Sequence, residues 1–450
     1  MFNAIILAAG EGKRMKSSKS KVLHEISFQP LVKWVMDAVS DADTTIVVVG
    51  HCAEQVREAL GDSVEYAEQK ERLGTGHAVM QARRFLEGYG GDVAVMTGDT
   101  PLIRKETIDS AYEFHKNSGN SATVLTAEVS DPFGYGRIVR DESGNVVKIV
   151  EQKDTTDDEK SIREINSGMF FFKASELLKA LDKLTNNNAQ GEYYLTDTLE
   201  ILIADGLKVG AYAVTDSDEI LGINDRVQLA AAQNIIQKRI VEKHMLNGVT
   251  FLSPDTAYIG KDVVVGKDTV IMPGTILKGN TQIGSGCVIG PNTQIFESKI
   301  DDGVEVNSSV ILESTVGSGT KVGPFAYIRP NSHIGKNIKI GDFVEIKNTT
   351  IDDGTKVSHL TYVGDADVGK KVNFGCGTVL VNYDGEKKYR SVIKDNAFIG
   401  CNTNLVSPVT VEENAFIAAG STITDNVPCH SLAIARARQV VKTDWKKKNK

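Results

Sequence analysis

The first segment that could do chemistry is a run of glycines and cations near the N-terminus, AAGEGKRMKSSKSKVLH, which follows a short apolar stretch. Gly10 and Gly12 would let the backbone approach a ligand closely, and backbone N–H groups in such a loop can bind phosphates. Lys13, Arg14 and Lys21 would add positive charge. The pattern alone is a weak signal, because an ordinary turn with solvated lysines has the same composition.

A carboxylate in the same half of the chain could hold a metal ion. Asp99, in MTGDTPL, lies just past an apolar stretch that reads as a strand. Mg²⁺ prefers oxygen ligands and keeps several waters, so a carboxylate at the edge of a sheet would suit it. The plainer alternative is that Asp99 caps the next helix.

A second candidate region lies far down the chain, where aliphatic residues recur at every sixth position. The core of such a repeat takes apolar side chains, so His359 and Asn373 are notable exceptions. Close after them comes the longest interruption of the repeat, VNYDGEKKYRS between Leu380 and Ile393. Insertions of this kind often line the binding face of a repeat structure. The plainer alternative is a histidine on the surface, which is common.

The elements that must position the first site alternate between strand and helix. Strands are predicted at 4–8, 45–49, 93–96 and 122–127, with helical stretches between them. This alternation is typical of a mainly parallel α/β sheet of Rossmann-like type, covered on both faces. Ligands in such folds bind outside the carboxyl ends of the strands. A connecting helix is predicted at 225–247, where Asn224 could cap it and Gly248 could end it.

The rest of the chain has a period of six residues. Aliphatic residues occupy seven successive sixth positions: Ile259, Val265, Ile271, Leu277, Ile283, Ile289 and Ile295. The register then slips and restarts several times, and the series ends at Ile423. This period fits a chain that turns a corner every six residues and points one aliphatic side chain inward per face. Because one coil cannot bury its own core, the coils must stack into an all-β solenoid.

Composition narrows the class of protein. The 450 residues suffice for two or three domains, and we predict limits of 1–222, 223–250 for the connecting helix, and 251–450 with a basic C-terminal tail. A net charge of −8 argues against nucleic acid as a partner. Five cysteines without metal-ligand spacing indicate a reducing compartment. No apolar run approaches the ~20 residues of a membrane span, so we expect a cytoplasmic protein without a membrane partner.

The glycine-rich motif, extended to LAAGxGxRMxS followed by KVLH, resembles the signature of nucleoside-diphosphate-sugar pyrophosphorylases. Those enzymes join a sugar 1-phosphate to a nucleoside triphosphate and release pyrophosphate. The chain departs from the signature at Lys13, where threonine is common, at Ser20, where proline is common, and in the SFQP segment at 27–30. These departures affect the geometry of the loop, but the chain retains the two cationic residues of the signature, Arg14 and Lys21.

This resemblance implies a role for each matching residue. The nucleotide would contact Leu7, Ala8, Ala9, Gly10, Lys21, Gln69, Gly74 and Thr75, and the sugar would contact Gly136, Glu151 and Asn166. Asp99 and Asn224 would hold Mg²⁺, with Asn224 also among the substrate-binding residues. Lys21 and Arg14 would be catalytic. In-line attack of a sugar-phosphate oxygen on the α-phosphorus needs positioning and charge neutralisation, and no protein nucleophile.

Three motifs in the repeat region, SHLTYVGDA, NFGCGT and VNYDG, resemble the acetyltransferase half of bifunctional N-acetylglucosamine-1-phosphate uridyltransferases. With the N-terminal motifs, this resemblance covers nearly the whole chain, and it implies a left-handed parallel β-helix. His359 would be the general base that deprotonates the ammonium of glucosamine 1-phosphate, since an imidazole titrates near neutral pH. The amine would attack the thioester of acetyl-CoA, and the N-acetylglucosamine 1-phosphate formed would react with UTP to give UDP-N-acetylglucosamine.

The same resemblance implies the binding residues of the acetyl-transfer site. The sugar phosphate would contact Arg329, Lys347, Tyr362, Asn373 and Lys388, and acetyl-CoA would contact Cys376, Asn382, Tyr383, Cys401, Ala419 and Arg436. Asn382 would also hold the reacting groups by hydrogen bonds. The family usually carries alanine or serine at the positions of Cys376 and Cys401. A cysteine nucleophile is the alternative, but direct transfer to the amine needs no acyl-enzyme.

The sequence is compatible with three functions. The first is a bifunctional enzyme with small-molecule substrates, assembled as a cyclic homotrimer with acyl-donor sites between prisms. The second is a nucleotidyltransferase whose β-helix serves only oligomerisation or regulation. The third is a binding scaffold, which leaves the glycine loop and Asp99 unexplained. The set of His359, Asn382, Tyr383 and Arg329 favours the first, because a silent module has no need of it.

Overall fold

The structure, a computed structural model, describes residues 2–445. They fall into two compact units, 1–236 and 237–450, and the boundary lies within helix α7 (Arg226–Leu246). The predicted basic end at 446–450 lies outside the described residues. Within the part that is described, no helix combines the length and the apolar character needed to cross a membrane.

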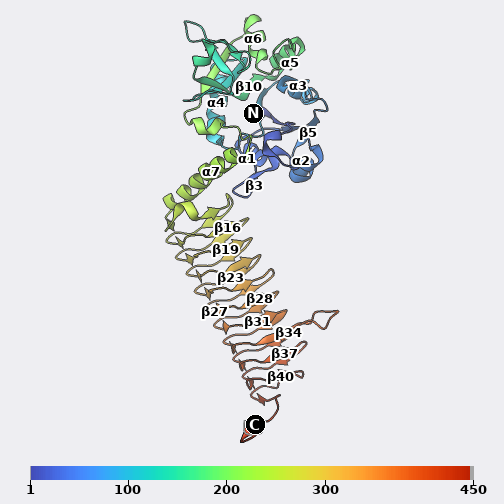
Figure 1. The fold of residues 1–450 in the computed structure, drawn as a ribbon, viewed down its shortest axis with the longest axis vertical. Coiled ribbons are helices and arrows are strands. Elements are labelled where there is room, and N and C mark those ends of the chain that lie inside the picture. Colours follow the sequence, from blue (N-terminus) through green and yellow to red (C-terminus); the bar gives the residue numbers. More distant parts are fainter. Residues whose placement is uncertain (1, 446–450) are drawn as a thin grey trace. The chain divides into compact units, whose positions relative to one another are not determined.

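The N-terminal unit is built on one mixed sheet (Figure 1). Its strands follow the order β11 (Val209–Ala213), β7 (Ala122–Glu128), β10 (Glu164–Lys173), β6 (Asp92–Thr97), β1 (Phe2–Ala8), β4 (Thr45–Val49) and β5 (Glu65–Glu68), with β8 (Arg137–Arg140) and β9 (Val146–Val150) beside β10. The four predicted strands are confirmed. Along this order the sheet is mainly parallel, as predicted, and the exception is β10, which runs antiparallel to both β6 and β7. The chain reaches β10 through the β8–β9 hairpin and not through an α-helical crossover, so nothing imposes a parallel direction.

Helices cover both faces of this sheet, as predicted. Along β1, Ala4 and Ile6 join one buried cluster while Ile5 joins the other, because successive side chains of a strand point to opposite faces. The first cluster includes residues of α1 (Leu31–Ala38), α2 (Ala53–Leu60) and α4 (Lys105–Asn117), and the second includes residues of α3 (Thr75–Met80), α5 (Ala174–Lys183) and α6 (Asp197–Ala204).

The ends of α7 match the sequence prediction with one correction. Asp225, and not Asn224, caps the helix, since its Oδ1 accepts hydrogen bonds from the N–H groups of Val227 and Gln228, each 2.9 Å. Asn224 is therefore available for another role. At the other end, Gly248 has a φ of +92° and a hydrogen bond joins the N–H of residue 249 to the carbonyl of residue 244, the pattern of a Schellman C-cap.

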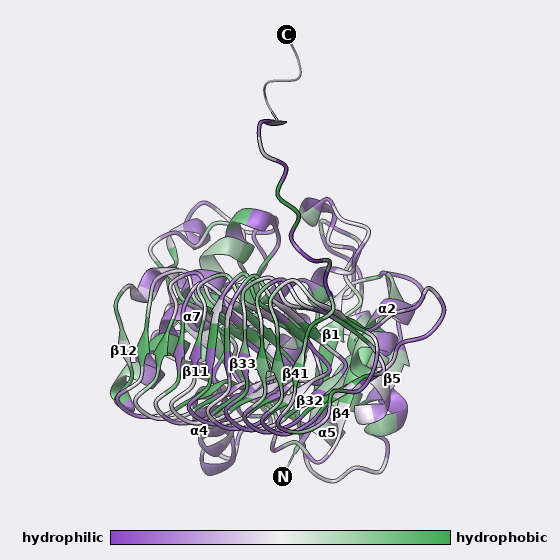
Figure 2. Cartoon of the chain, turned by 90° about the horizontal axis from the view of Figure 1, so that it is seen from below, coloured by the Kyte–Doolittle hydropathy of each residue, from purple (hydrophilic) through white to green (hydrophobic). Residues whose placement is uncertain are grey.

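The C-terminal unit is a prism of three parallel sheets with 11, 10 and 9 strands, from β12 (Thr250–Phe251) to β41 (Leu432–Ala433). One coil normally spans three strands, so that Val270 pairs with Val288, eighteen residues on. Val288 pairs with Glu305, seventeen residues on, and such shortened coils account for the slips of the six-residue register. The predicted aliphatic residues form one continuous buried core. Figure 2 looks along this unit and shows hydrophobic strands joined by more polar corners.

The predicted interruption forms a short hairpin after β34 (Val379–Val381) and before β35 (Ser391–Ile393). Tyr383 and Lys388 pair across it as an antiparallel bridge. Asp384 Oδ1 closes its tip by accepting hydrogen bonds from the N–H groups of residues 386 and 387, at 2.8 and 2.7 Å. The hairpin projects from the side of the prism (Figure 1).

Candidate functional site

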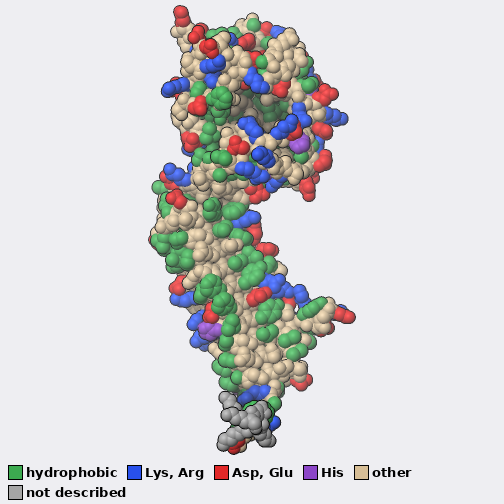
Figure 3. Space-filling model, in the orientation of Figure 1, with side chains coloured by type: hydrophobic (Ala, Val, Ile, Leu, Met, Phe, Trp, Pro, Cys, Tyr) green, Lys and Arg blue, Asp and Glu red, His purple; other side chains and the backbone are tan. Residues whose placement is uncertain are grey.

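The first candidate site is a pocket of about 280 Å³ beyond the carboxyl ends of β1 and β6. Figure 3 shows a hollow on this unit with lysine and arginine side chains beside it. Eight residues predicted for the site line the pocket: Leu7, Ala9, Gly10, Lys21, Gln69, Gly74, Thr75 and Asp99. Three others do not. Ala8 is buried in the core, Arg14 is exposed on the short 3-10 helix Lys13–Met15, and Asn224 lies just before α7.

Lys21 joins the two residues predicted to bind Mg²⁺. Its ammonium forms an ion pair with the Asp99 carboxylate and donates a hydrogen bond of 3.2 Å to Asn224 Oδ1. The Asn224 Nδ2 donates to the carbonyl of Gly222 at 3.3 Å, which turns the amide oxygen toward Lys21. Two oxygens thus converge on one position suited to a cation, and Mg²⁺ typically takes few protein ligands beside waters and phosphates. Among residues 2–445, no group of three or more His, Cys, Asp or Glu offers a fuller metal site.

Two glycines shape the walls around this position. Gly12 has a φ of +63°, and a Cβ there would lie 2.7 Å from the Cβ of Lys21, so glycine lets the loop pack directly on the lysine stem. Gly74 has a φ of +107°, and a Cβ there would lie 2.5 Å from the carbonyl oxygen of Tyr193. Gln69 Nε2 donates to the Gly74 carbonyl at 3.0 Å and supports this turn. Close packing therefore holds Lys21 against the loop at Gly12, and it holds the turn at Gly74, next to Gln69, against Tyr193.

A second pocket adjoins the first and shares Leu7, Thr75 and Thr97 with it. It contains all three residues predicted to contact the sugar, Gly136, Glu151 and Asn166. Burial raises the pKa of Glu151, and the Thr196 hydroxyl donates a 3.3 Å hydrogen bond to its carboxylate. The two pockets together make a cleft with cationic groups at one end and sugar-type hydrogen-bonding groups at the other.

Ser20 is one of the positions at which the chain departs from the family signature, and its backbone is hydrogen-bonded to Gln55. The Ser20 N–H donates to Gln55 Oε1 at 3.0 Å, and Gln55 Nε2 donates to the carbonyl of Ser18 at 3.2 Å. Proline could not donate the first of these bonds. Gln55, from α2, thus braces the backbone directly before Lys21.

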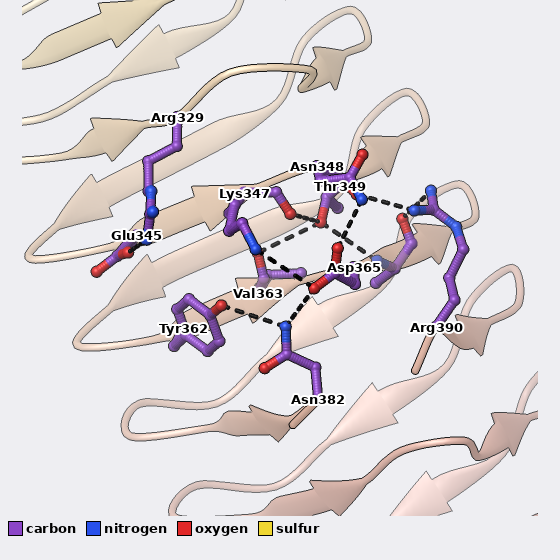
Figure 4. A network of polar contacts seen from close by, with 11 residues as sticks. Arg329, Glu345, Lys347, Asn348, Thr349, Tyr362, Val363, Asp365, Asn382 and Arg390 are labelled. Carbon is purple, nitrogen blue, oxygen red and sulfur yellow. Dashed lines mark hydrogen bonds and ion pairs between the residues drawn. The ribbon is translucent and has the colours of Figure 1, made fainter. Parts of the chain in front are cut away.

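The second candidate site includes a polar network on the prism (Figure 4). At its centre, Asp365 accepts hydrogen bonds from Asn348 Nδ2 (2.6 Å) and Asn382 Nδ2 (2.5 Å) and pairs with Lys347 at 3.7 Å. Asn382 also donates to the Tyr362 hydroxyl at 3.3 Å. Burial acts to raise the pKa of Asp365, but the hydrogen bonds from Asn348 and Asn382 and the charge of Lys347 outweigh it and lower the pKa. Three predicted residues, Lys347, Tyr362 and Asn382, therefore meet around one carboxylate.

Further cations surround this network. Arg329 donates to Glu345 at 2.8 Å, one coil on (Figure 4). Lys388, on the hairpin, lies beside Lys347. A hydrogen bond that the Lys347 ammonium donates to the neutral amine of Lys388, and the repulsion between the two groups when both are charged, lower the pKa of Lys388. Two amines crowded together in this way form a natural anion site, because an anion between them would relieve the repulsion.

His359 lies at a corner of the prism, at the end of β30 (Lys356–His359). Its Nδ1 is 2.5 Å from Oδ1 of Asp342, the last residue of β27 (Lys339–Asp342) one coil earlier. The register continues through the following coils. The core residues of successive coils pair in the order Ile340, Val357, Phe374, Ile399 and Ile417. The residue two positions after each of them therefore stacks on its counterpart in the next coil. This column runs Asp342, His359, Cys376, Cys401 and Ala419.

This column contains three residues predicted to contact acetyl-CoA, Cys376, Cys401 and Ala419, directly in line with His359. Arg436 lies at its end, where its side chain would be 3.6 Å from a Cβ on Gly420. All five cysteines of the chain are free thiols.

Other predicted residues are not brought to His359 within the chain. Asn373 begins β33 (Asn373–Phe374) and pairs with Lys356, at the opposite end of β30 from His359. Asn382 belongs to the network on the sheet of β31 (Tyr362–Gly364) and β34, whereas His359 ends a strand of another sheet. Tyr383 stands on the hairpin with 55% of its surface exposed. The corner and the network are thus separate clusters in one copy of the chain.

Sequence reasoning missed four residues of these clusters: Asp342, Glu345, Asn348 and Asp365. A signal was present for three of them, because Asp342, Glu345 and Asp365 each lie about one coil, 16 or 17 positions, from a predicted residue. Asn348 lies 17 positions from Asp365. Residues one coil apart stack, so counting back from His359 and Asn382 finds Asp342 and Asp365.

Comparisons with known proteins agree with both halves of the molecule. The nucleotidyl transferase family matches residues 3–220, and the bacterial transferase hexapeptide family matches residues 262–297, 313–348 and 390–425. Relatives named bifunctional protein GlmU include one from Acetivibrio thermocellus, 60% identical over 98% of this chain and 96% of its own length. Another from Clostridioides difficile is 52% identical over 100% of this chain and 98% of its own length. The chain therefore belongs to the GlmU family of bifunctional transferases, with a nucleotidyltransferase domain followed by a hexapeptide-repeat acetyltransferase domain.

Proposed function

We propose that this chain transfers the acetyl group of acetyl-CoA to glucosamine 1-phosphate, and then a uridylyl group from UTP to the N-acetylglucosamine 1-phosphate formed. The observation that carries the proposal is the corner column, in which His359 stacks on Cys376, Cys401 and Ala419. A β-helix that served only oligomerisation would not need a histidine paired with a carboxylate in line with acyl-donor positions.

In the acetyl-transfer step, His359 takes a proton from the substrate ammonium, and the free amine attacks the thioester carbonyl. The carbon–sulfur bond breaks, and the thiolate leaves and takes up the proton that the attacking nitrogen gives up, which yields the amide and coenzyme A. Lys347, Lys388 and Arg329 supply the positive charge that a sugar phosphate requires. Asp365 orients Lys347, and Asn382 and Tyr362 support that carboxylate through their contacts with one another.

In the uridylyl-transfer step, a phosphate oxygen of the sugar attacks the α-phosphorus of UTP in line, and pyrophosphate leaves. When bound, Mg²⁺ supplies charge neutralisation for the phosphates, and Asp99 and Asn224 are the residues that would hold it. Lys21 then exchanges its ion pair with Asp99 for the phosphates, and Arg14 closes on them from the exposed loop. Glu151, Asn166 and the backbone at Gly136 orient the sugar.

A homotrimer would bring the two clusters of the prism together. The hairpin projects from its own chain with Tyr383 half-exposed, so it can reach the His359 corner of a neighbouring copy. Beside that corner, Phe325 and Phe343 stack at 5.5 Å, and with Leu360 they form an exposed apolar ridge, 56–59% accessible, that an adjacent prism would cover. The domain limits 1–222, 223–250 and 251–450 and a cytoplasmic location belong to the same proposal.

Product analysis with single omissions tests the two-step reaction. Purified protein is given glucosamine 1-phosphate, acetyl-CoA, UTP and Mg²⁺, and then each component is left out in turn. Omission of acetyl-CoA should stop all product, and omission of UTP should stop the reaction at N-acetylglucosamine 1-phosphate. Uridylyl transfer to added N-acetylglucosamine 1-phosphate without any acetyl transfer would favour a silent β-helix.

A further inference from the structure

Two neighbouring strands of the prism differ from the rest of their sheet. β27 and β30 have four residues each, whereas the other nine strands of this sheet have two. The two extra positions of each strand extend the ladder and pair Asp342 directly with His359. Gly341 permits the close approach, because a Cβ at this position would collide with the carbonyl oxygen of Ser358. The extended ladder places a carboxylate beside the imidazole.

The backbone turns immediately after both residues. Phe343 and Leu360 have φ values of +55° and +45°, in the left-handed region that non-glycine residues rarely adopt. The Leu360 N–H donates a 3.0 Å hydrogen bond to the carbonyl of Asp342, which ties the two corners together. Asp342 and His359 are thus held between a paired strand on one side and a tied corner on the other.

The chemistry of the pair fixes which ring nitrogen carries the proton. The hydrogen bond from His359 lowers the pKa of Asp342, so the carboxyl group is ionised and can only accept. The proton in the 2.5 Å contact therefore resides on Nδ1. In the neutral ring the lone pair is then on Nε2. The ring is about half-exposed, and Nε2 has no hydrogen-bond partner among residues 2–445.

We propose that Asp342 is a positioning residue for acetyl transfer: it holds His359 in the tautomer and orientation that present Nε2 to the substrate ammonium. This rests on the proposed function of His359. When Nε2 takes the proton, the imidazolium keeps its Nδ1–H hydrogen bond, and the Asp342 carboxylate stabilises the new positive charge. Asp342 itself stays ionised and touches neither substrate.

Three variants in the full-length protein test this role. Asp342→Asn keeps the size of the side chain and removes its charge, so kcat for acetyl transfer should fall about 10- to 100-fold, while KM for both substrates stays within about twofold. Asp342→Glu restores a carboxylate and should recover part of the lost kcat. The matched control is Glu305→Gln, which removes a carboxylate from the 2.8 Å ion pair with Lys321 on the same sheet and should leave kcat unchanged.

¹⁵N NMR of labelled histidine gives a readout that a purely structural role would not move. The signal of His359, identified among the eight histidines by its loss in His359→Ala, should report the Nδ1–H tautomer in the wild type and a shift toward the Nε2–H tautomer in Asp342→Asn. The inference is overturned by an unchanged tautomer, by a change confined to KM, or by a further loss when Asp342→Asn is added to His359→Ala. Full acetyl transfer by His359→Ala would instead refute the proposed function itself, and the inference with it.

Discussion

The two candidate sites are assembled from the chain in different ways. Lys21 contacts Asp99 and Asn224 across 78 and 203 positions of sequence, so the cation site exists only when the whole mixed sheet and the start of α7 are in place. In the prism, His359 contacts Asp342 and Asn382 contacts Asp365 across 17 positions each, which is a single coil. The first site therefore depends on global topology, and the second on local stacking.

Because of this difference, we expect a substitution to disturb the structure over a different range in the two units. Stability in a stacked repeat is approximately a sum of coils and their nearest neighbours, so a change in one coil is felt mainly by the adjoining coils. The two sites also share no residue. Each activity should therefore be removable alone, and the following variants are ordered by the size of the expected effect.

His359→Ala should have the largest effect, a loss of acetyl transfer of about 10²- to 10⁴-fold, because the Asp342 carboxylate left at the corner is a much weaker base than an imidazole. Uridylyl transfer to added N-acetylglucosamine 1-phosphate should be unchanged, as measured by pyrophosphate release. His333→Ala is the matched control, since His333 is an exposed histidine of the same prism whose ring hydrogen-bonds to the Thr315 hydroxyl at 3.1 Å. An equal loss of acetyl transfer and uridylyl transfer in folded His359→Ala would refute the assignment of the two activities to separate sites.

Asp99→Asn should show the reverse pattern. It removes the negative charge that attracts Mg²⁺ and pairs with Lys21, so uridylyl transfer should fall about 100-fold or more while acetyl transfer is kept. The Mg²⁺ concentration for half-maximal uridylyl transfer should rise as well. Asp62→Asn, at an exposed position of the same unit, is the control. Full Mg²⁺-dependent activity in Asp99→Asn would refute the metal role.

The same contrast explains what could be predicted from the sequence. In the prism, six-residue counting locates the core and, extended to one coil, finds the partner of His359, because stacking converts sequence distance into contact. In the N-terminal unit, counting cannot show that β10 runs antiparallel or that Gln55 braces Ser20, since those contacts follow from how strands are ordered. Asn224 was ambiguous between cap and ligand until the neighbouring Asp225 was seen to fill the cap.

Gly364→Ala tests the network without touching a charged group. A Cβ at Gly364 would collide with the Tyr362 hydroxyl and lie 2.9 Å from Asn382 Nδ2, so both side chains must shift and the hydrogen bonds around Asp365 are disturbed. Lys347 would lose its orientation, and KM for glucosamine 1-phosphate should rise about tenfold, with a smaller change in kcat. Gly260→Ala, whose added Cβ meets nothing closer than 3.6 Å in the same prism, should behave as the wild type. An unchanged KM in Gly364→Ala would mean that the network does not position the phosphate-binding lysine.

The smallest effect is expected at Gln55. A substitution there tests whether the first site, like a coil of the prism, tolerates a local loss of backbone hydrogen bonds. Gln55→Ala removes the bonds to Ser20 N–H and to the Ser18 carbonyl, so the segment before Lys21 gains freedom and kcat for uridylyl transfer should fall about three- to tenfold. Ser20 has φ −52° and ψ 138°, which proline can adopt, and within the described part of the chain its buried hydroxyl has no hydrogen-bond partner to lose. Ser20→Pro added to Gln55→Ala should therefore restore most of the rate by stiffening the same backbone covalently. If the double variant stayed as slow as Gln55→Ala, the loss would come from α2 itself, and the approach of Lys21 to Asp99 would be set by the sheet alone.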